Sequence, residues 1–283
     1  MAHPRTQIYD STLDPPLPLN VVGPFVYEDP DHPSLKRLRE QEHPDDVAGS
    51  GSTFERLMRL RNWVATQWDF STPEPYPPWD AVTILDWIRN RKTGGFCGIY
   101  AIVFGQAAIS LGLRHMRFVE LGHERNPICH FLTEVWHPEQ KKWVVLDPVQ
   151  GIGGTFTRGD EYLSALDLHE ARMTGQIEGI QYHPPPEPPR ARRHKRYTLE
   201  DWLHSYYYVR WVWRQNFLTE PPPYWNINNT FDRYYDCVEW RDSRTTPWEE
   251  SNAPLFPTCP PHVPLCWRRA NDASLIYATP AED

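Results

Sequence analysis

The chain has 283 residues, which is enough for one well-buried core carrying additional elements. Its formal net charge of −8 argues against a general nucleic-acid binder, because phosphate contacts need a basic face. Apolar residues make up 40% and charged residues 23%, as in ordinary globular proteins, while the 30 prolines indicate long extended connections over the surface.

The N-terminal part carries little hydrophobic periodicity. Residues 1–53 are rich in proline, aspartate and histidine, so we expect an extended N-terminal arm laid against the core. Residues 1–20 lack the apolar stretch of a signal peptide, which leaves the compartment open: cytoplasmic as written, or secreted or periplasmic if a leader was removed. The longest mostly apolar stretch, 101–113, is too short to span a bilayer, so we expect no transmembrane segment.

Two amphipathic helices are predicted next. Ser52 and Glu55 form a capping-box pattern ahead of apolar residues at helical spacing, which predicts a helix over 54–68. After a turn-rich stretch, Asp80 can cap a second helix that stops near Gly94.

The hydrophobic pattern changes from helix-like to strand-like after residue 113. The segment 97–113 is apolar on nearly all sides, as expected for a helix surrounded by protein, and Gly112 stands where a C-terminal cap belongs. The short segments 114–121, 129–136 and 141–147 are aromatic or β-branched and are separated by turn residues. Helices followed by consecutive strands favour an α+β fold, with the buried helix packed on an antiparallel sheet.

The second half is less regular. Helices are expected over 164–174 and over 198–218, the latter long and aromatic with Thr198 as its cap, and the rest is expected to be mostly irregular. We therefore divide the chain after the N-terminal arm into a catalytic core, 54–182, and an extension, 183–283, made of a proline-rich linker and an aromatic-rich segment packed on the core.

Cys97 is the candidate nucleophile. It stands at the first turn of the predicted buried helix, where unpaired amides and the helix dipole stabilise a thiolate. Gly94 and Gly95 before it allow a tight approach of the backbone, and Gly98 after it leaves room for a substrate.

His130 and Asp147 are the candidate base and its orienting carboxylate. His130 lies in the predicted middle strand, a rigid position for a general base, and Asp147 ends the next strand, within reach of a histidine on its neighbour. Strand alternation places His130 and Glu134 on one face and Cys129 on the other, so Cys129 is interpreted as a buried structural thiol. Taken singly, each of these residues also fits an ordinary structural role.

The order of the motifs adds to this hypothesis. GGFCGIYAIVFGQAAISLGL, HFLTEVW and WVVLDP resemble the transglutaminase-like core in the chain order Cys, His, Asp, over roughly residues 54–150. The resemblance implies a papain-like arrangement in which the nucleophile opens a buried helix and the other two residues lie on neighbouring strands. Members often carry tryptophan two residues after the histidine, where this chain has Leu132, a departure that concerns local packing or substrate shape more than the triad.

Other constellations are weaker. The Cys97 amide is a first candidate oxyanion donor, and Trp79 is a candidate second donor, although core packing at a helix start is the favoured explanation of this tryptophan. His123, Cys129 and His130 are conceivable zinc ligands, but no second pair at finger-like spacing completes the set.

The extension offers several open alternatives. Its aromatic residues could line a peptide or carbohydrate groove, or pack as a helix on the core, which helical spacing favours. Cys259 and Cys266 could form a disulfide or remain separate thiols, the basic tract 190–196 is interpreted as a solvated linker, and Asn228 fits a glycosylation acceptor only in a secreted eukaryotic protein. The aromatic residues concerned are Tyr206, Tyr207, Tyr208, Trp211, Trp213, Tyr224 and Trp225.

Together these features predict cysteine-dependent acyl transfer on a peptide, protein or carboxamide substrate through a thioester. Water would resolve the thioester in a protease or amidase, and an amine would do so in a transglutaminase; the resemblance favours hydrolysis. One alternative is a non-catalytic module of the same fold that binds a peptide or glycan through the aromatic extension. Another is an assembly protein whose proline-rich arms wrap a partner. No cofactor is expected, and no metal, because no acidic loop resembles a calcium site; the oligomeric state is left open.

Overall fold

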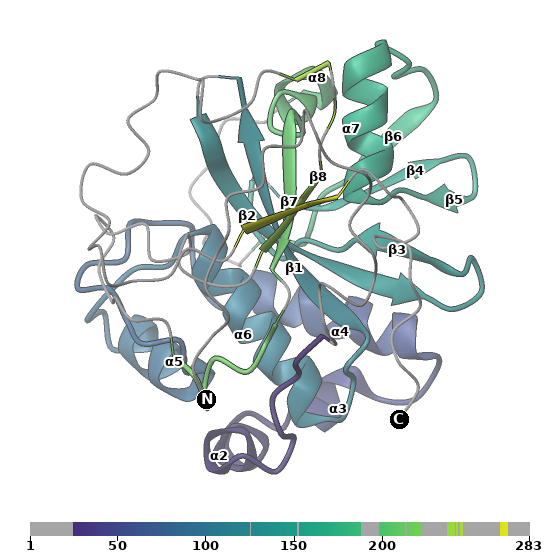
Figure 1. The fold of residues 1–283 in the computed structure, drawn as a ribbon. Helices are drawn as coiled ribbons and strands as arrows, with labels where there is room; N and C mark the ends of the chain where they lie inside the picture. Colours follow the sequence, from purple (N-terminus) through teal and green to yellow (C-terminus); the bar gives the residue numbers. More distant parts are fainter. Residues whose placement is uncertain are drawn as a thin grey trace.

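The protein has an α+β fold in which one large sheet is covered on both faces (Figure 1). In Figure 1, α2 to α6 gather on one side of this sheet, while α7, α8 and a smaller sheet lie on the other. The computed structural model describes residues 25–124, 126–151, 153–187, 198–212, 214–221, 237–240, 242, 244–245 and 267–270.

Two helices precede the predicted start of the core, so the expectation of an extended arm over residues 1–53 is wrong for this part. The helix α2 spans Pro33–Glu42 and α3 spans Pro44–Ala48. Each begins with proline, whose fixed φ and missing N–H suit the first position of a helix. Leu35 and Leu38 of α2 are completely buried, so this segment belongs to the core.

The next two helices begin close to where they were predicted, but the second ends at Arg89, before the predicted stop near Gly94. The helix α4 spans Thr53–Ala65 and starts with the expected capping box between Ser52 and Glu55. The helix α5 spans Ala81–Arg89, and the side chain of its N-cap residue Asp80 accepts a hydrogen bond from the second amide of the helix.

The central helix α6 spans Cys97–Ser110, and every residue in it after Cys97 is buried. It contacts α2, α4, α5 and the sheet, which explains why its sequence is apolar on all sides. Gly112 adopts a left-handed φ of 70° just beyond the helix, as expected for a C-terminal glycine.

The predicted strands form one half of the large sheet. The strands β1 (Met116–His123), β2 (Asn126–His137) and β3 (Lys142–Val145) pair antiparallel in the order β3-β2-β1. Their side chains alternate between two cores: Phe118 and Phe131 pack on the α6 side, whereas their neighbours Val119 and Leu132 pack with the elements of the opposite side.

The other half of the large sheet comes from the extension, where the prediction of a long helix over 198–218 is wrong. Among the described residues of this range, only α8 (Leu199–Leu203) is α-helical, capped by Thr198 as expected. It is followed by the strand β7, Tyr208–Val212, which is buried throughout and pairs antiparallel with β1. The aromatic and β-branched residues of this segment therefore fill a central strand, for which they are well suited.

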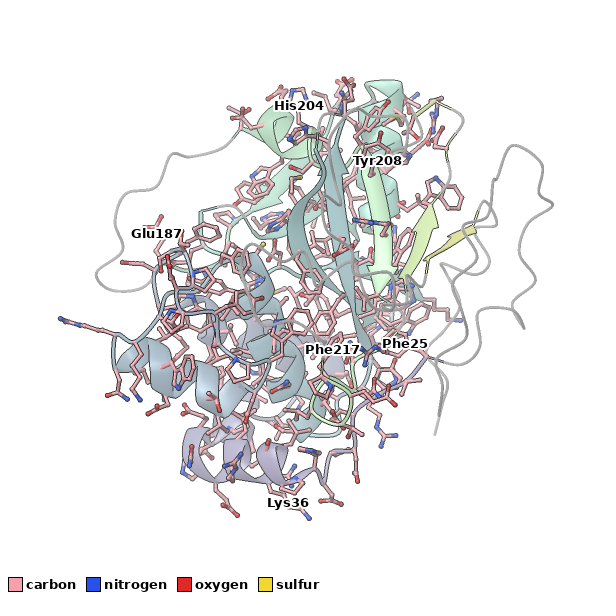
Figure 2. All side chains as sticks on the ribbon, turned by 60° about the vertical axis from the view of Figure 1, so that its left-hand side comes forward. Phe25, Lys36, Glu187, His204, Tyr208 and Phe217 are labelled. Atoms are coloured by element: carbon pink, nitrogen blue, oxygen red, sulfur yellow. The ribbon has the colours of Figure 1, made fainter. Side chains whose placement is uncertain are left out.

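Two further strands extend the sheet in a region that was expected to be irregular. The strand β8 (Cys237–Trp240) pairs antiparallel with β7, and β9 (Trp267–Ala270) pairs parallel with β8. Figure 2 shows the two ends of β7: His204 and Tyr208 mark one end, and Phe25 and Phe217 lie at the other.

The face opposite α6 is covered by α7 and by a small sheet. The helix α7 spans Ala165–Thr174, close to the predicted range, and begins with a capping box at Ser164. The strands β4 (Thr155–Arg158), β5 (Glu161–Tyr162) and β6 (Ile180–His183) pair antiparallel in the order β5-β4-β6.

A buried ion pair ties these layers together. Oε2 of Glu134 on β2 lies 2.7 Å from Nη2 of Arg117 on β1, and the two side chains are 0% and 3% exposed. The same carboxylate accepts hydrogen bonds from the indole of Trp211 on β7 at 2.8 Å and from the amide of Ala165, which starts α7, at 2.7 Å. A charge buried without partners is strongly unfavourable, so these contacts fix the mutual position of β1, β2, β7 and α7.

Several predictions fall on segments outside the described residues. They concern the basic tract 190–196, the acceptor Asn228, the cysteines Cys259 and Cys266, and residues 1–24 of the arm. Among the helices of the described part, none combines the length and the apolar character needed to cross a bilayer.

Candidate active site

Cys97 occupies the first position of α6. The preceding residue, Phe96, has an extended backbone, and its side chain does not cap the helix. The first-turn amides of a helix have no intrahelical partner, so an uncapped N-terminus presents donors to whatever lies in front of it. Cys97 itself is partly exposed while the rest of α6 is buried, so it forms the partly exposed tip of a buried helix.

Gly94 and Gly95, which precede Cys97, lie where neighbouring atoms leave no space for a side chain. A Cβ on Gly94 would lie 2.4 Å from the carbonyl oxygen of Thr72, and one on Gly95 would lie 2.4 Å from the indole nitrogen of Trp68. Neither contact leaves room for a side chain. The prediction that these glycines permit a close backbone approach is confirmed.

His130 and Asp147 are brought together as predicted. Nε2 of His130 lies 2.6 Å from Oδ2 of Asp147, and the two side chains are 3% and 2% exposed. The second ring nitrogen, Nδ1, has no hydrogen-bond partner among the described residues. An imidazole that is anchored through Nε2 keeps Nδ1 available for proton transfer.

Asp147 is held by its own backbone surroundings. Its amide donates to the carbonyl of Gly154 at 2.9 Å, and its Oδ1 accepts a hydrogen bond from the amide of Val149 at 2.9 Å. Gly153 packs directly against the carboxylate, since a Cβ there would lie 2.6 Å from Cγ of Asp147. Both carboxylate oxygens are therefore engaged, one by the loop and one by His130.

The electrostatics of the pair favour a charged imidazole. Burial lowers the pKa of His130, but the negative charge and hydrogen bond of Asp147, together with the nearby thiol of Cys97, outweigh it and raise the pKa above its ordinary value. His130 therefore holds a proton more firmly than a solvated histidine does. An imidazolium beside a cysteine at a helix N-terminus is the arrangement that stabilises a thiolate.

Cys129 has different surroundings from Cys97. Burial raises the pKa of the Cys129 thiol to about 11, an effect that a hydrogen bond with Ser205 partly opposes. A thiol in this state is a poor nucleophile near neutral pH. Cys129 is partly exposed, as Cys97 is, so the interpretation of Cys129 as a buried structural thiol stays a prediction; its raised pKa is what distinguishes it from a reactive cysteine.

Trp79 lies inside the core, with a side chain 2% exposed. Its indole meets the ring of Phe217 edge to face at 4.6 Å, and its Nε1 donates to the hydroxyl of Tyr76 at 3.0 Å. This donor is the only one that a tryptophan side chain has. The oxyanion role of Trp79 stays a prediction. The hydroxyl of Tyr76 lies 4.0 Å from where a Cβ on Gly98 would stand.

Four of the aromatic residues singled out in the extension are buried rather than arranged on a surface. Tyr206, Tyr207, Tyr208 and Trp211 are between 0% and 7% exposed, so these four do not line an open groove. The other three, Trp213, Tyr224 and Trp225, fall outside the described residues. Of the conceivable zinc ligands, His130 is bound through Nε2 to Asp147, and no cluster of three metal-binding side chains occurs within the described part of the chain.

Sequence reasoning missed three residues around the triad. Arg61 is 4% exposed; burial lowers its pKa to about 10, and the negative charge of Asp147 opposes this. Its place among Leu57 and Val64 on the buried face of the first predicted helix was a visible signal. The other two, Tyr182 and Trp202, lie close to the triad only because of the tertiary fold.

A family model matches the part of the chain that holds the candidate site. Residues 42–148, which contain all three candidate triad residues, match the model of the transglutaminase-like superfamily. A search of solved structures found Legionella pneumophila LapG, EGTA-treated, with 12% sequence identity, coverage of 54% of this chain and 73% of that chain, and a TM-score of 0.32. No curated protein matches the chain.

Proposed function

We propose that this transglutaminase-like domain catalyses cysteine-dependent acyl transfer on a peptide or carboxamide bond, with Cys97 as nucleophile. The observation that carries the proposal is the 2.6 Å contact between Nε2 of His130 and Oδ2 of Asp147, which leaves Nδ1 for the thiol at the tip of α6. The match over residues 42–148 supports it, because a Cys-His-Asp core is a general property of the superfamily.

In the first half of the reaction, the sulfur of Cys97 attacks the carbonyl carbon of the substrate. A sulfur–carbon bond forms, and the proton of the thiol resides on His130. When the tetrahedral intermediate collapses, the carbon–nitrogen bond breaks and His130 gives that proton to the leaving amine. Asp147 remains ionised throughout and stabilises the charged imidazole.

In the second half, the thioester on Cys97 is attacked by water or by an amine. Water gives a carboxylic acid and makes the protein a protease or amidase, while an amine gives a new amide and makes it a transglutaminase. His130 removes a proton from the attacking molecule and returns it to the sulfur as the thioester bond breaks. Hydrolysis is the favoured outcome and amine transfer the alternative.

The intermediate places negative charge on the former carbonyl oxygen. The amide of Cys97, in the uncapped first turn of α6, supplies one hydrogen bond to this oxygen. The hydroxyl of Tyr76 supplies the second, and Trp79 orients that hydroxyl through the 3.0 Å hydrogen bond between them. In this scheme Trp79 supports the oxyanion donor rather than contacting the substrate.

The test compares wild type with Cys97→Ala in two assays run side by side, one for hydrolysis of a peptide mixture and one for incorporation of an amine into glutamine peptides. Cys129→Ala is the matched control, because it removes a thiol of the same kind in a different environment. We expect Cys97→Ala to lose about a thousandfold or more of the activity, and Cys129→Ala to keep activity within about threefold of wild type.

A second measurement distinguishes an enzyme from a binding module of the same fold. Iodoacetamide at about pH 6 should alkylate Cys97 selectively, because only a stabilised thiolate reacts at that pH. Equal turnover by wild type and Cys97→Ala, or labelling of Cys97 no faster than that of Cys129, would refute the proposal.

A further inference from the structure

We infer that Trp202 is a positioning residue of the active site, and that with Tyr182 and Gly153 it forms a cover that keeps water away from the hydrogen bond between His130 and Asp147. The inference rests on the proposed function, because it assigns these residues to the same triad. All three cover residues lie beyond the segment 42–148 that matches the superfamily.

The first side of the cover is made by aromatic rings. The ring centroid of Trp202 lies 6.0 Å from that of His130 and 5.9 Å from that of Tyr182. Trp202 is itself 5% exposed, so its ring is buried and separates the imidazole of His130 from solvent. Its helix, α8, is short but begins with a capping box between Thr198 and Asp201, which defines the start of the helix that carries Trp202.

The second side of the cover reaches the carboxylate. The hydroxyl of Tyr182 on β6 donates to the carbonyl of Gly153 at 2.7 Å. Gly153 in turn packs on the carboxylate of Asp147, and the room for a Cβ is missing there. The contacts therefore run from His130 through Trp202, Tyr182 and Gly153 to Asp147, and they connect the two ends of the bond between His130 and Asp147.

Excluding water strengthens this bond. The attraction between a carboxylate and an imidazolium grows as the effective dielectric constant around them falls. A cover over both groups also removes the water molecules that would compete for Nε2 of His130 and for Oδ2 of Asp147. The physical result is a fixed ring orientation, with Nδ1 directed to Cys97 in every catalytic cycle.

The test uses Trp202→Leu in the full chain, with Trp143→Leu as the matched control. Trp143 is 4% exposed, and its ring contacts Trp136 and Arg117, so its loss opens a cavity of the same size elsewhere. The readout is the exchange rate with water of the downfield ring N–H proton of His130, measured by proton NMR. We expect this rate to rise about tenfold or more in Trp202→Leu and to remain within about twofold of wild type in Trp143→Leu.

The kinetic consequence separates positioning from general destabilisation. We expect kcat to fall about tenfold in Trp202→Leu with KM within about twofold of wild type, and the alkaline limb of the kcat profile to move to lower pH. The direction follows because a fully solvated histidine has the lower, ordinary pKa, and admitting water brings His130 closer to that state. Tyr182→Phe removes only the hydroxyl that donates to Gly153, so we expect the exchange rate, kcat and the alkaline limb to change in the same directions, with the rate and kcat changing by about threefold.

The NMR measurement is repeated in the Cys97→Ala background, where no turnover is needed. If the wild type shows no Cys97-dependent reaction but the ring proton still exchanges faster in Trp202→Leu, the proposed function fails and the cover stands. An exchange rate and a pH profile that do not change in Trp202→Leu, or that change equally in Trp143→Leu, would overturn the inference. Should Trp202→Leu not fold, Tyr182→Phe decides the question by the same two readouts.

Discussion

Replacing Gly153 by alanine measures how closely the position of the Asp147 carboxylate controls catalysis. The added Cβ would lie 2.5 Å from the carbonyl oxygen of Val149 and 2.6 Å from Cγ of Asp147, whereas ordinary contacts are 3.4–4 Å. Because φ at Gly153 is outside the left-handed region, alanine can adopt the backbone, and the effect comes from crowding alone.

The magnitude follows from this geometry. The oxygen of Val149 belongs to the backbone and cannot rotate away, so the loop and the carboxylate must move by about 1 Å, a misplacement that costs about a hundredfold in rate. We therefore expect kcat/KM to fall about a hundredfold in Gly153→Ala. Selective alkylation of Cys97 at about pH 6 should slow as well, since His130 loses its anchored partner.

The matched control is Gly105→Ala, in the same central helix as Cys97 but about two turns along it. A Cβ there would lie 2.7 Å from the ring of Phe118, so this variant is crowded to a similar degree without touching the triad. We expect it to lower the free energy of unfolding by about 1–3 kcal/mol while the folded protein keeps its activity within about threefold. A folded Gly153→Ala protein with wild-type kcat/KM would refute the reasoning.

Three more outcomes are expected. Asp147→Asn should lower kcat by about 10⁴-fold. It should also move the alkaline limb of the pH profile to lower pH, because His130 loses the partner that raises its pKa. Because the pKa of His130 is raised in the folded protein, the stability that its charge contributes is fully present below about pH 6.5 and is lost as the pH rises through the raised pKa. In urea unfolding, the loss of free energy of unfolding caused by Asp147→Asn should therefore become smaller at alkaline pH. Cys129→Ala should leave the pH dependence of alkylation unchanged, since a thiol with a pKa of about 11 does not react at neutral pH; loss of the fast-labelling site in this variant would contradict the assignment. Glu134→Leu should lower the free energy of unfolding by about 3–5 kcal/mol, because it leaves Arg117 charged and buried without its partner, and a change under about 1 kcal/mol in urea denaturation would show that the ion pair does not hold the layers together.

The local elements of the catalytic half could be predicted because their signals are local. A capping box at Ser52, an N-cap at Asp80 and an all-round apolar segment after Cys97 each reflect hydrogen bonds or burial within one helix. The order Cys, His, Asp in the sequence also sufficed to name the three residues that converge. Where proline starts a helix, as at Pro33, composition misled the prediction, because the same residue that breaks a helix interior is favoured at its first position.

The extension could not be predicted in the same way. Residues 198–218 contain aromatic residues at both helical and alternating spacing, and the choice between them is made by β1, whose free edge accepts β7. The buried partners of Glu134 come from β1, β7 and α7, and no spacing pattern in the sequence predicts that these residues contact Glu134.

From short-range periodicity the sequence by itself placed Cys97 at a helix start and His130 and Asp147 on adjacent strands, and its resemblance to the transglutaminase-like core made them the candidate nucleophile, base and carboxylate. Only the tertiary structure decided how the charged pair is sealed. Trp202 and Tyr182 reach His130 and Asp147 from elements that follow the matched segment, and water exclusion depends on which surfaces meet in space, a property that no single segment carries.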